Sequence, residues 1–403
     1  MYLARRHAAP ARPWWLAVGM LSAIGLGAAA VAFMGVASFV ARLVVTPPRR
    51  ATEDMRILDH DADRGTITLT RTPDSVIDGR YGLWFDRDSG YAKVGAVMDV
   101  SANRVVRELH AVEEGTPRRG ARCRLSGWYY RDPGELGVPF DEVDVSTTIG
   151  AAPAWRVPAH DDRGRWVIQV HGRAVDRREV IRAVPVFRDA GYTSLLVSYR
   201  NDGLAPRSDD GLYALGDIEW LDVEAAIRFA VDNGAKQIIL MGWSMGGATV
   251  LQAVSRSRLA HFVSGIVLES PVVDWVTALD HQAGTRRIPR VVTAAVYRLL
   301  TRPWGRVVTG QAAPIDLRRL DFVTRAMELR LPMLILHSDD DRFVPNSASR
   351  ALARARPDIV TFPEITGAGH TRVWNVDPER WTRVIREWLD ARVSEPSSRA
   401  PGA

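Results

Sequence analysis

Gly242-Trp243-Ser244-Met245-Gly246-Gly247 directly follows the apolar run Gln237-Ile238-Ile239-Leu240-Met241, which we predict to be a buried strand. The hexapeptide fits the pattern Gly-x-Ser-x-Gly, which forms a sharp turn from a strand into a helix and presents the serine hydroxyl as a nucleophile. The turn is crowded, so the positions two before and two after the serine must be nearly free of side chains. Gly242 and Gly246 meet that need. With 32 glycines in the chain, the alternative is a glycine-rich turn in which Ser244 is incidental.

Two loops further along the chain contain candidate partners for this serine. A serine hydroxyl needs a base to remove its proton, and the base needs a third group to orient it. The predicted strand 333–336 is followed by His337-Ser338-Asp339-Asp340-Asp341, and the predicted strand 360–362 by a glycine-flanked loop that ends in His370. Each candidate lies just past the carboxyl end of a strand, where open α/β sheets place their chemistry. We therefore predict that Ser244 attacks, that His370 acts as general base and then general acid, and that an aspartate of 339–341 orients the imidazole. The alternative for His370 is a solvated loop residue.

The segment from about Ala154 to Val393 resembles an α/β-hydrolase catalytic domain, most similar to the prolyl-oligopeptidase-like and esterase-like serine hydrolases. In that family the acid is usually the aspartate of a His-Gly-x-x-Asp-x-x-Val-Pro stretch. The positions that match are His337, Asp341, Val344 and Pro345, while Ser338 replaces the glycine. The resemblance favours Asp341 over Asp339 and Asp340. Asp274, which follows the predicted strand 265–269, is a further alternative because some relatives supply the acid from that place.

Acyl transfer also requires hydrogen-bond donors for the developing oxyanion. The turn itself supplies the backbone N–H of Met245. The predicted strand 166–170 ends in His171-Gly172-Arg173-Ala174, and its His-Gly pair resembles the oxyanion motif of the family. The resemblance implies that Arg173 donates its backbone N–H and that His171 supports the loop. The Arg173 side chain would either contact an anionic group of the substrate or point to solvent.

Composition limits the classes of function. The chain has 403 residues, of which 46% are hydrophobic and 25% charged, as in an ordinary globular protein long enough for two domains. The net charge is +6, but the arginines are spread along the chain and no nucleic-acid-binding motif accompanies them, so we expect no nucleic-acid partner. The sequence has a single cysteine and no His-Glu-x-x-His motif, so we expect no metal and no cofactor. The expected partner is a small-molecule or lipid acyl substrate, and the oligomeric state is open.

Residues 14–41 form an uncharged, mostly apolar stretch that is longer than the roughly 20 residues needed to cross a bilayer. No clean small-x-small cleavage site stands at its far end, which favours an uncleaved anchor over a signal peptide. We predict a single-pass membrane anchor over residues 14–41, preceded by a basic segment over residues 1–13. Because that leading segment is short and basic, we expect the catalytic domain to lie outside the cytoplasm.

The rest of the chain divides into three further parts. Residues 42–140 are predicted to hold a juxtamembrane segment and a small β-rich accessory domain, since short alternating runs occur at 66–70, 81–85, 91–98 and 104–112. The catalytic domain is predicted over residues 141–394 and a disordered tail over residues 395–403.

A cap over the active site is predicted at about 272–325, with an amphipathic helix over 292–300. From His281 to Ile315 the sequence has six arginines and no acidic residue. This stretch would lie either on an anionic bilayer or over the pocket with its arginines in water.

Together these features predict an α/β-hydrolase fold: a mostly parallel, doubly wound sheet with a helical cap, preceded by a small β-rich region and one transmembrane helix. The predicted activity is that of a membrane-anchored serine hydrolase that cleaves an ester, thioester or amide through an acyl-enzyme on Ser244. An acyltransferase using the same triad, a serine peptidase and a non-catalytic hydrolase-like binding protein are the alternatives.

Overall fold

The computed structural model describes residues 14–48 and 50–394, and for residues 14–29 and 392–394 it describes the backbone alone. The predicted basic segment 1–13 and the predicted tail 395–403 lie outside the described residues. The chain divides into two compact units. The smaller unit contains residues up to Val44 together with Arg287–Pro314, and the larger unit contains Val45–Arg286 and the chain from Ile315 onward.

The larger unit contains an eight-stranded sheet in the order β14-β13-β12-β11-β9-β10-β8-β7. Its strands are β7 (Asp141–Thr147), β8 (Gly150–Val157), β9 (Arg165–Val170), β10 (Thr193–Val197), β11 (Gln237–Trp243), β12 (Val263–Glu269), β13 (Met333–Leu336) and β14 (Val360–Thr361). The pairs from β14 to β10 are parallel, whereas β8 pairs antiparallel with both β10 and β7. The strands predicted at 166–170, 237–241, 265–269 and 333–336 are confirmed.

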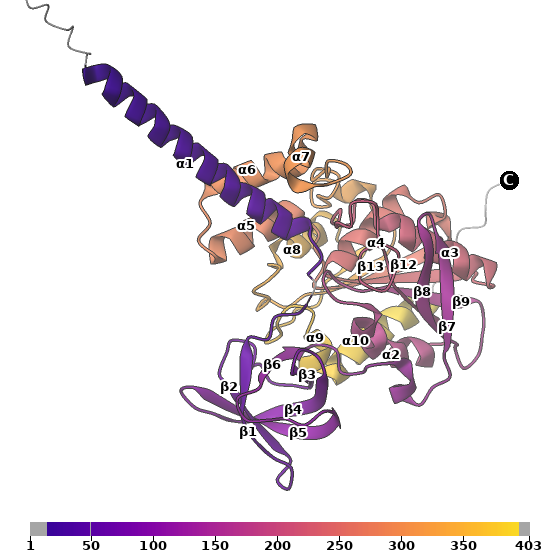
Figure 1. Cartoon of the computed structure of the whole chain (residues 1–403). Helices are drawn as coiled ribbons and strands as arrows, with labels where there is room; N and C mark the ends of the chain where they lie inside the picture. Colours follow the sequence, from indigo (N-terminus) through magenta and orange to yellow (C-terminus); the bar gives the residue numbers. More distant parts are fainter. Residues whose placement is uncertain (1–13, 49, 395–403) are drawn as a thin grey trace, which may run out of the picture. The chain divides into compact units, whose positions relative to one another are not determined.

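Both faces of this sheet are buried, which explains why its central strands are apolar without alternation. Ile239 and Met241 point to the face where Phe187 of α2 (Val184–Asp189) and Ile385 of α10 (Pro378–Ser394) complete a core. The alternate residues, such as Leu240, point to the opposite face and are also fully buried. On that face Figure 1 shows α3 (Trp220–Asp232) and α4 (Met245–Arg256). The sheet therefore has the doubly wound architecture that the sequence predicts.

Six strands before the sheet form a closed antiparallel barrel in the order β1-β2-β5-β4-β3-β6. They are β1 (Met55–Asp61), β2 (Thr66–Thr70), β3 (Tyr81–Phe85), β4 (Gly90–Val100), β5 (Arg104–Glu114) and β6 (Arg122–Ser126). The interior is apolar and includes Ile57, Leu83 and Val94, which are fully buried. The barrel closes through the pairing of Met55 with Cys123, so no strand edge is left open. Alternation in the sequence predicts β2, β3, β4 and β5 but neither β1 nor β6.

The remaining helical elements of the larger unit lie mostly in connections between strands. They are η1 (Pro133–Leu136), η2 (Arg177–Ala183), η3 (Ala260–Phe262), α5 (Trp275–Thr285), η5 (Ala326–Glu328), α8 (Ser347–Ala355) and α9 (Val373–Val376).

The smaller unit contains α1 (Trp14–Val45) up to Val44, α6 (Arg290–Thr301), η4 (Pro303–Gly305) and α7 (Arg306–Thr309). The predicted cap is thus divided, because residues 287–314 belong to this unit and α5 belongs to the other. That the segment covers the active site stays a prediction. Among the described residues, no helix has both the length and the apolar character required to cross a bilayer. Much of the predicted anchor 14–41 has no described side chains, so it too stays a prediction.

Candidate active site

Ser244 is the single residue between the end of β11 and the start of α4. Its backbone has φ 50° and ψ −116°, a conformation that residues with a side chain rarely adopt. Two hydrogen bonds hold it there, one to the last residue of β12 and one to the chain beyond that strand: Ser244 N–H donates to Glu269 O at 3.1 Å, and Val272 N–H donates to Ser244 O at 3.0 Å. Such a strained residue persists only when its surroundings enforce it, as they do here.

Neighbouring backbone atoms leave no room for a side chain at the two glycines of the motif. A Cβ at Gly246 would lie 2.2 Å from Val170 O, and a Cβ at Gly242 would lie 2.6 Å from Gly246 O. Real Cβ atoms do not approach that closely, so a side chain at either position would displace backbone. The crowding expected from the sequence pattern is therefore present.

The structure brings together the three predicted catalytic side chains. His370 Nε2 lies 2.8 Å from Ser244 Oγ, and His370 Nδ1 lies 2.7 Å from Asp341 Oδ2. With the proton on Nδ1, the ring donates to the carboxylate and accepts the hydroxyl proton at Nε2. This is the arrangement that a general base for a serine requires.

Asp341 is buried and held by several donors. Its Oδ1 accepts hydrogen bonds from the N–H groups of Phe343 and Val344, each at 2.9 Å, and its Oδ2 also lies 3.2 Å from His337 Nε2. Burial alone would raise the pKa of Asp341, but His370 and His337 outweigh it and hold that pKa well below its usual value. The carboxyl group is therefore ionised throughout the physiological pH range.

The other candidate acids have different partners. Asp339 accepts from Asn346 Nδ2 and from Arg350 Nη2, and Asp274 accepts from two N–H groups at the start of α5. Asp340 Oδ2 accepts from Gly367 N–H at 2.6 Å. Of the four, Asp341 is the one that contacts His370.

Ser338, which replaces the glycine of the family pattern, joins the acid loop to the histidine loop. It is fully buried, and its Oγ accepts a hydrogen bond from Ala368 N–H at 3.2 Å. Asp339 N–H, from the acid loop, donates to Ile365 O at 2.8 Å, just before the histidine loop. Together with the Asp340–Gly367 bond, these contacts fix the two loops that carry the acid and the base.

The predicted oxyanion loop lies against the nucleophile. A Cβ at Gly172 would approach Ser244 Cβ to 3.2 Å, so the loop that continues into Arg173 is adjacent to the serine. Gly172 N–H donates to Glu179 Oε2 at 2.7 Å, which fixes the loop. Met245 is the first residue of α4, so its N–H has no acceptor within the helix.

His171 supports this loop from inside the protein. Its Nδ1 lies 2.9 Å from Gly172 O and its Nε2 lies 3.1 Å from Asp202 Oδ2, while its ring stacks on Tyr199 at 4.2 Å. Burial alone would lower the pKa of His171, but Asp202 raises it above its usual value. The charged imidazole can donate at both nitrogens, which suits these two acceptors.

The Arg173 side chain is bound within the protein, which contradicts the alternative that it points to solvent. That it contacts an anionic group of the substrate stays a prediction. Its Nη2 donates to Thr46 O at 2.9 Å, and its guanidinium lies over the Tyr213 ring at 5.5 Å. Burial lowers the pKa of Arg173. A partly desolvated guanidinium needs an acceptor, and the chain beyond α1 supplies one.

Glu269, at the end of β12, is a supporting residue that sequence reasoning missed. Its buried carboxylate accepts from Trp243 Nε1 at 3.1 Å, from Trp381 Nε1 at 2.8 Å and from Val373 N–H at 3.2 Å. It therefore links the strand before Ser244 to the helix that follows His370. Its position at a strand end is the sole sequence signal that could have identified it.

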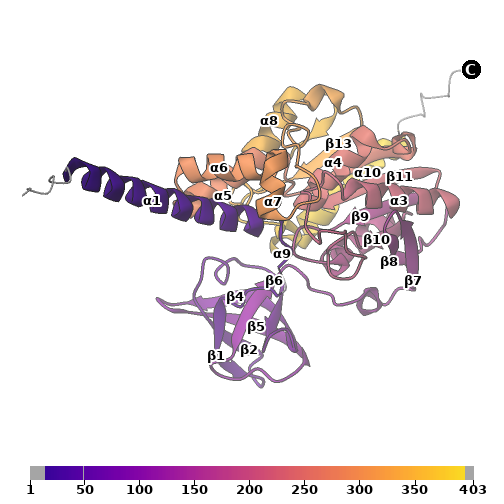
Figure 2. The same ribbon diagram turned by 45° about the horizontal axis from the view of Figure 1, so that its top comes forward.

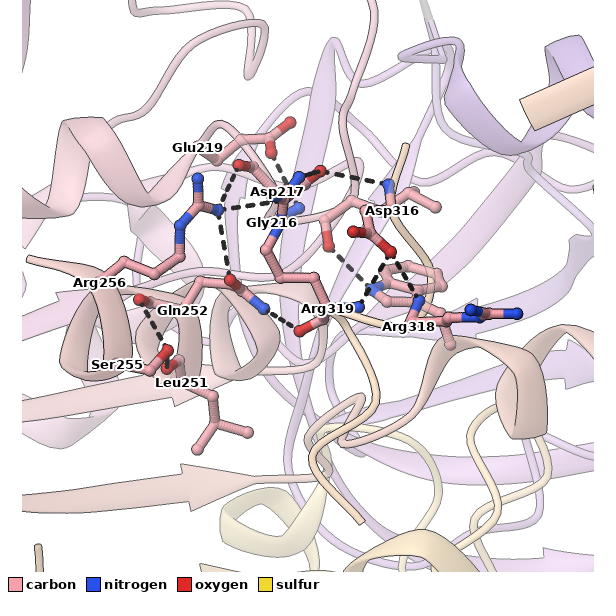
Figure 3. A network of polar contacts seen from close by, with 12 residues as sticks. Gly216, Asp217, Glu219, Leu251, Gln252, Ser255, Arg256, Asp316, Arg318 and Arg319 are labelled. Carbon is pink, nitrogen blue, oxygen red and sulfur yellow. Dashed lines mark hydrogen bonds and ion pairs between the residues drawn. The ribbon is translucent and has the colours of Figure 1, made fainter. Parts of the chain in front are cut away.

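A second polar network, shown in Figure 3, fixes the far end of α4. The nearly buried Asp217 accepts from Arg256 Nη1 at 3.0 Å and from Arg319 at 2.7 and 2.9 Å. Gln252 Nε2 donates to Arg319 O at 2.6 Å. The helix that begins beside Ser244 is thus held at its carboxyl end as well.

The barrel also contacts the histidine loop. Arg372, two residues after His370, forms an ion pair with Asp74 at 2.9 Å. The barrel segment that contains Asp74 is organised by Arg107, which is fully buried and donates to the backbone oxygens of Ser75, Ile77 and Gly79. The loop that carries the predicted base therefore rests on a segment of the barrel.

Comparisons with known proteins match these two parts of the larger unit. The family model described as a domain of unknown function (DUF8805) matches residues 56–126, which form the barrel. The model of the alpha/beta hydrolase family matches residues 167–384, from β9 into α10. No curated protein matches the sequence.

The structure is similar to solved structures of esterases, one of which reaches a TM-score of 0.50. An esterase from Pyrococcus furiosus is 20% identical, with a TM-score of 0.50 over 64% of this chain and 94% of that chain. An esterase from Thermogutta terrifontis is 21% identical, with a TM-score of 0.46 over 62% of this chain and 99% of that chain. Because the hydrolase family match covers more than half of the sequence and the fold agrees with it, the chain belongs to the alpha/beta hydrolase family.

Proposed function

We propose that the protein is a serine hydrolase that cleaves an ester, thioester or amide through an acyl-enzyme on Ser244. The hydrogen-bonded series from Asp341 through His370 to Ser244 carries this proposal. Its distances of 2.7 and 2.8 Å are those at which a positioned base takes a proton.

The mechanism follows from the atoms in contact. His370 Nε2 takes the proton of Ser244 as Oγ bonds to the substrate carbonyl carbon, and Asp341 stabilises the imidazolium that forms. When the tetrahedral intermediate collapses, His370 gives that proton to the leaving alcohol, thiol or amine. Water then attacks the acyl-enzyme, with His370 again acting as the base, and releases the acid.

Backbone N–H groups are the proposed donors to the oxyanion. Met245 contributes the N–H at the start of α4, where the helix dipole also favours negative charge. Arg173 contributes the second N–H from the loop beside Ser244. Losing one such donor typically slows turnover by about 10²–10³.

An ester is the favoured substrate class. Peptidases of the prolyl-oligopeptidase type that bind a free amino terminus use an acidic pair, which the sequence does not reveal. An acyltransferase would use the same three side chains and differ in the acceptor that resolves the acyl-enzyme. The short Ser244–His370 distance favours a catalytic protein over a hydrolase-like binding protein.

We further propose that residues 14–41 anchor the protein in a membrane, with the catalytic domain outside the cytoplasm. The support is the uncharged, apolar composition of this stretch and the basic residues before it. Protease treatment of intact cells, compared with lysed cells, tests this orientation. Degradation of the catalytic domain only after lysis would contradict it.

Turnover of a series of aryl esters with increasing acyl length tests the activity. Ser244→Ala should lower kcat/KM on the order of 10⁶-fold, because the triad acts as a unit. Ser255→Ala is the matched control: it lies on the same helix, and its hydroxyl bonds only to helix carbonyls. Equal activity in the two variants would refute the proposed nucleophile. Added alcohol acceptors in the same assay reveal acyl transfer.

A further inference from the structure

The smaller unit combines α1 up to Val44 with α6, η4 and α7. Figures 1 and 2 both show α6 lying beside α1. The composition of its surface differs from that of an ordinary soluble protein.

Apolar side chains are exposed on each of these elements. Val307 is 90% exposed, Val291 65% and Trp304 53%, and on α1 Val31 is 74% and Phe39 68% exposed. Single exposed apolar residues are common on soluble proteins. Here they occur on neighbouring elements of one small unit, which is typical of a surface that binds a partner or a membrane.

A groove of about 400 Å³ lies between α1 and α6. It is lined by apolar side chains, among them Phe33 and Met34 of α1, Val291 of α6 and Trp304. Arg298 is its one charged lining residue. An apolar channel with a single cation has the chemistry to accept a hydrocarbon chain that carries an anionic group.

The charges around the groove have one sign. The sequence from His281 to Ile315 contains six arginines and no acidic residue. Arg290, Arg298 and Arg302 are exposed, and none of them forms an ion pair within the described part of the chain. An excess of positive charge adds little to the stability of a surface that faces only water. The same excess attracts an anionic surface.

We propose that this surface docks on an anionic lipid bilayer. Val291, Trp304 and Val307 would enter the interfacial region, a lipid acyl chain would occupy the groove, and the arginines would meet lipid phosphates. Val291, Trp304 and Val307 lie outside residues 14–41, whereas Phe33 and Met34 of the groove lie within the proposed anchor, so the docking surface would adjoin the anchor. A second copy of the chain is a poorer occupant, because its arginines would face those of the first.

The depth of position 307 in a membrane tests the proposal. The full chain with Val307→Cys is reconstituted into vesicles of phosphatidylcholine, with and without phosphatidylserine, and labelled with an environment-sensitive fluorophore. The one native cysteine, Cys123, is buried, so the label attaches at the new position. Met327→Cys is the matched control, because Met327 is 75% exposed and belongs to the larger unit.

Docking predicts a blue-shifted emission at position 307 in anionic vesicles, quenched by lipids brominated in their acyl chains, with no change at position 327. Each basic residue near an anionic bilayer raises the ratio of docked to undocked protein roughly fivefold. Replacing Arg290, Arg298 and Arg302 together by Gln should therefore lower that ratio on the order of 100-fold in anionic vesicles.

Three outcomes would overturn the proposal. The first is equal emission at positions 307 and 327 in protein that floats with the vesicles, which would place the surface in water. The second is failure of the protein to float with anionic vesicles. The third is an emission shift that depends on protein concentration in detergent without lipid, which would identify a second copy as the occupant. None of these measurements depends on catalysis. A protein without the proposed activity could therefore still show docking, and the two proposals are tested independently.

Discussion

Arg80 and Asn375 exchange two hydrogen bonds: Arg80 N–H donates to Asn375 O at 2.9 Å, and Asn375 Nδ2 donates to Arg80 O at 2.7 Å. Arg80 precedes the first residue of β3, and Asn375 lies in α9, five residues after His370. The segments are in close contact, since a Cβ at Gly79 would lie 2.2 Å from Asn375 O. The exchange joins the barrel to the loop of the proposed general base.

Replacing Asn375 should therefore affect both stability and reactivity. Asn375 is fully buried and also accepts from Arg182 Nη1 at 2.9 Å. Asn375→Ala removes the side-chain hydrogen bonds to Arg80 O, Gly127 O and Arg182 Nη1, whereas the bond from Arg80 N–H to the backbone oxygen of residue 375 remains. Each buried group left unpaired costs about 1–3 kcal/mol. We expect a lower Tm and, well below that Tm, slower labelling of Ser244 by a fluorophosphonate.

Arg64→Ala is the control for this experiment, because it removes only an exposed pair with Asp61 between β1 and β2. It should change neither quantity. A lower Tm with an unchanged labelling rate in Asn375→Ala would mean that the barrel contact is structural and does not position His370.

Adding one methyl group at Gly246 should damage the protein. The new Cβ would lie 2.2 Å from Val170 O, so β9 or α4 must shift. We expect Gly246→Ala to lose about 1–3 kcal/mol of stability and most of its activity. Gly284→Ala, in α5 with nothing within 4 Å of the new Cβ, should be neutral or more stable by about 0.5–1 kcal/mol. Similar denaturant midpoints for the two variants would contradict the crowding argument.

Asp341→Asn should lower kcat by about 10⁴, because the amide favours the wrong imidazole tautomer. It should also change how stability depends on pH. The folded pKa of Asp341 is below its ordinary value of 3.8, so the carboxylate stabilises the fold above that pH, and this stabilisation is lost progressively as pH falls below it.

Between about pH 5 and pH 3, the Tm of wild type should therefore fall more steeply than that of Asp341→Asn. Asp161→Asn alters an exposed pair with Arg163 and should follow wild type. Parallel curves for wild type and Asp341→Asn would show that this carboxyl group does not titrate abnormally.

Ser338→Gly restores the family pattern but should destabilise this protein. The buried Ala368 N–H would lose the acceptor that Ser338 Oγ provides at 3.2 Å. We expect a loss of about 1–3 kcal/mol by chemical denaturation. An unchanged unfolding free energy would mean that water replaces the hydroxyl at no cost.

The predictable parts of this protein are those encoded locally. The apolar run 237–241 and the glycines around Ser244 predict the strand, the turn and the crowding, because all three depend on adjacent residues. The chain order of serine, acid and histidine predicts the residues that meet. The match to the family pattern at Val344 and Pro345 distinguishes Asp341 from its neighbours.

The parts that could not be predicted depend on contacts between distant residues. The carboxylate of Glu269 bonds to Trp381, which is 112 residues away, and Arg173 bonds to Thr46, which is 127 residues away. The barrel closes by pairing Met55 with Cys123, and no periodicity in β1 or β6 indicates that partner. Nothing in the local sequence specifies these pairings.

The most direct test of the central proposal is to identify the residue that reacts with a fluorophosphonate. Purified full-length protein is treated with the probe, digested and analysed by mass spectrometry. We predict one adduct on the peptide that contains Ser244, formed in wild type and absent from both Ser244→Ala and protein denatured before treatment. An adduct on another residue, or no adduct on folded wild type, would contradict the assignment of Ser244 as the nucleophile.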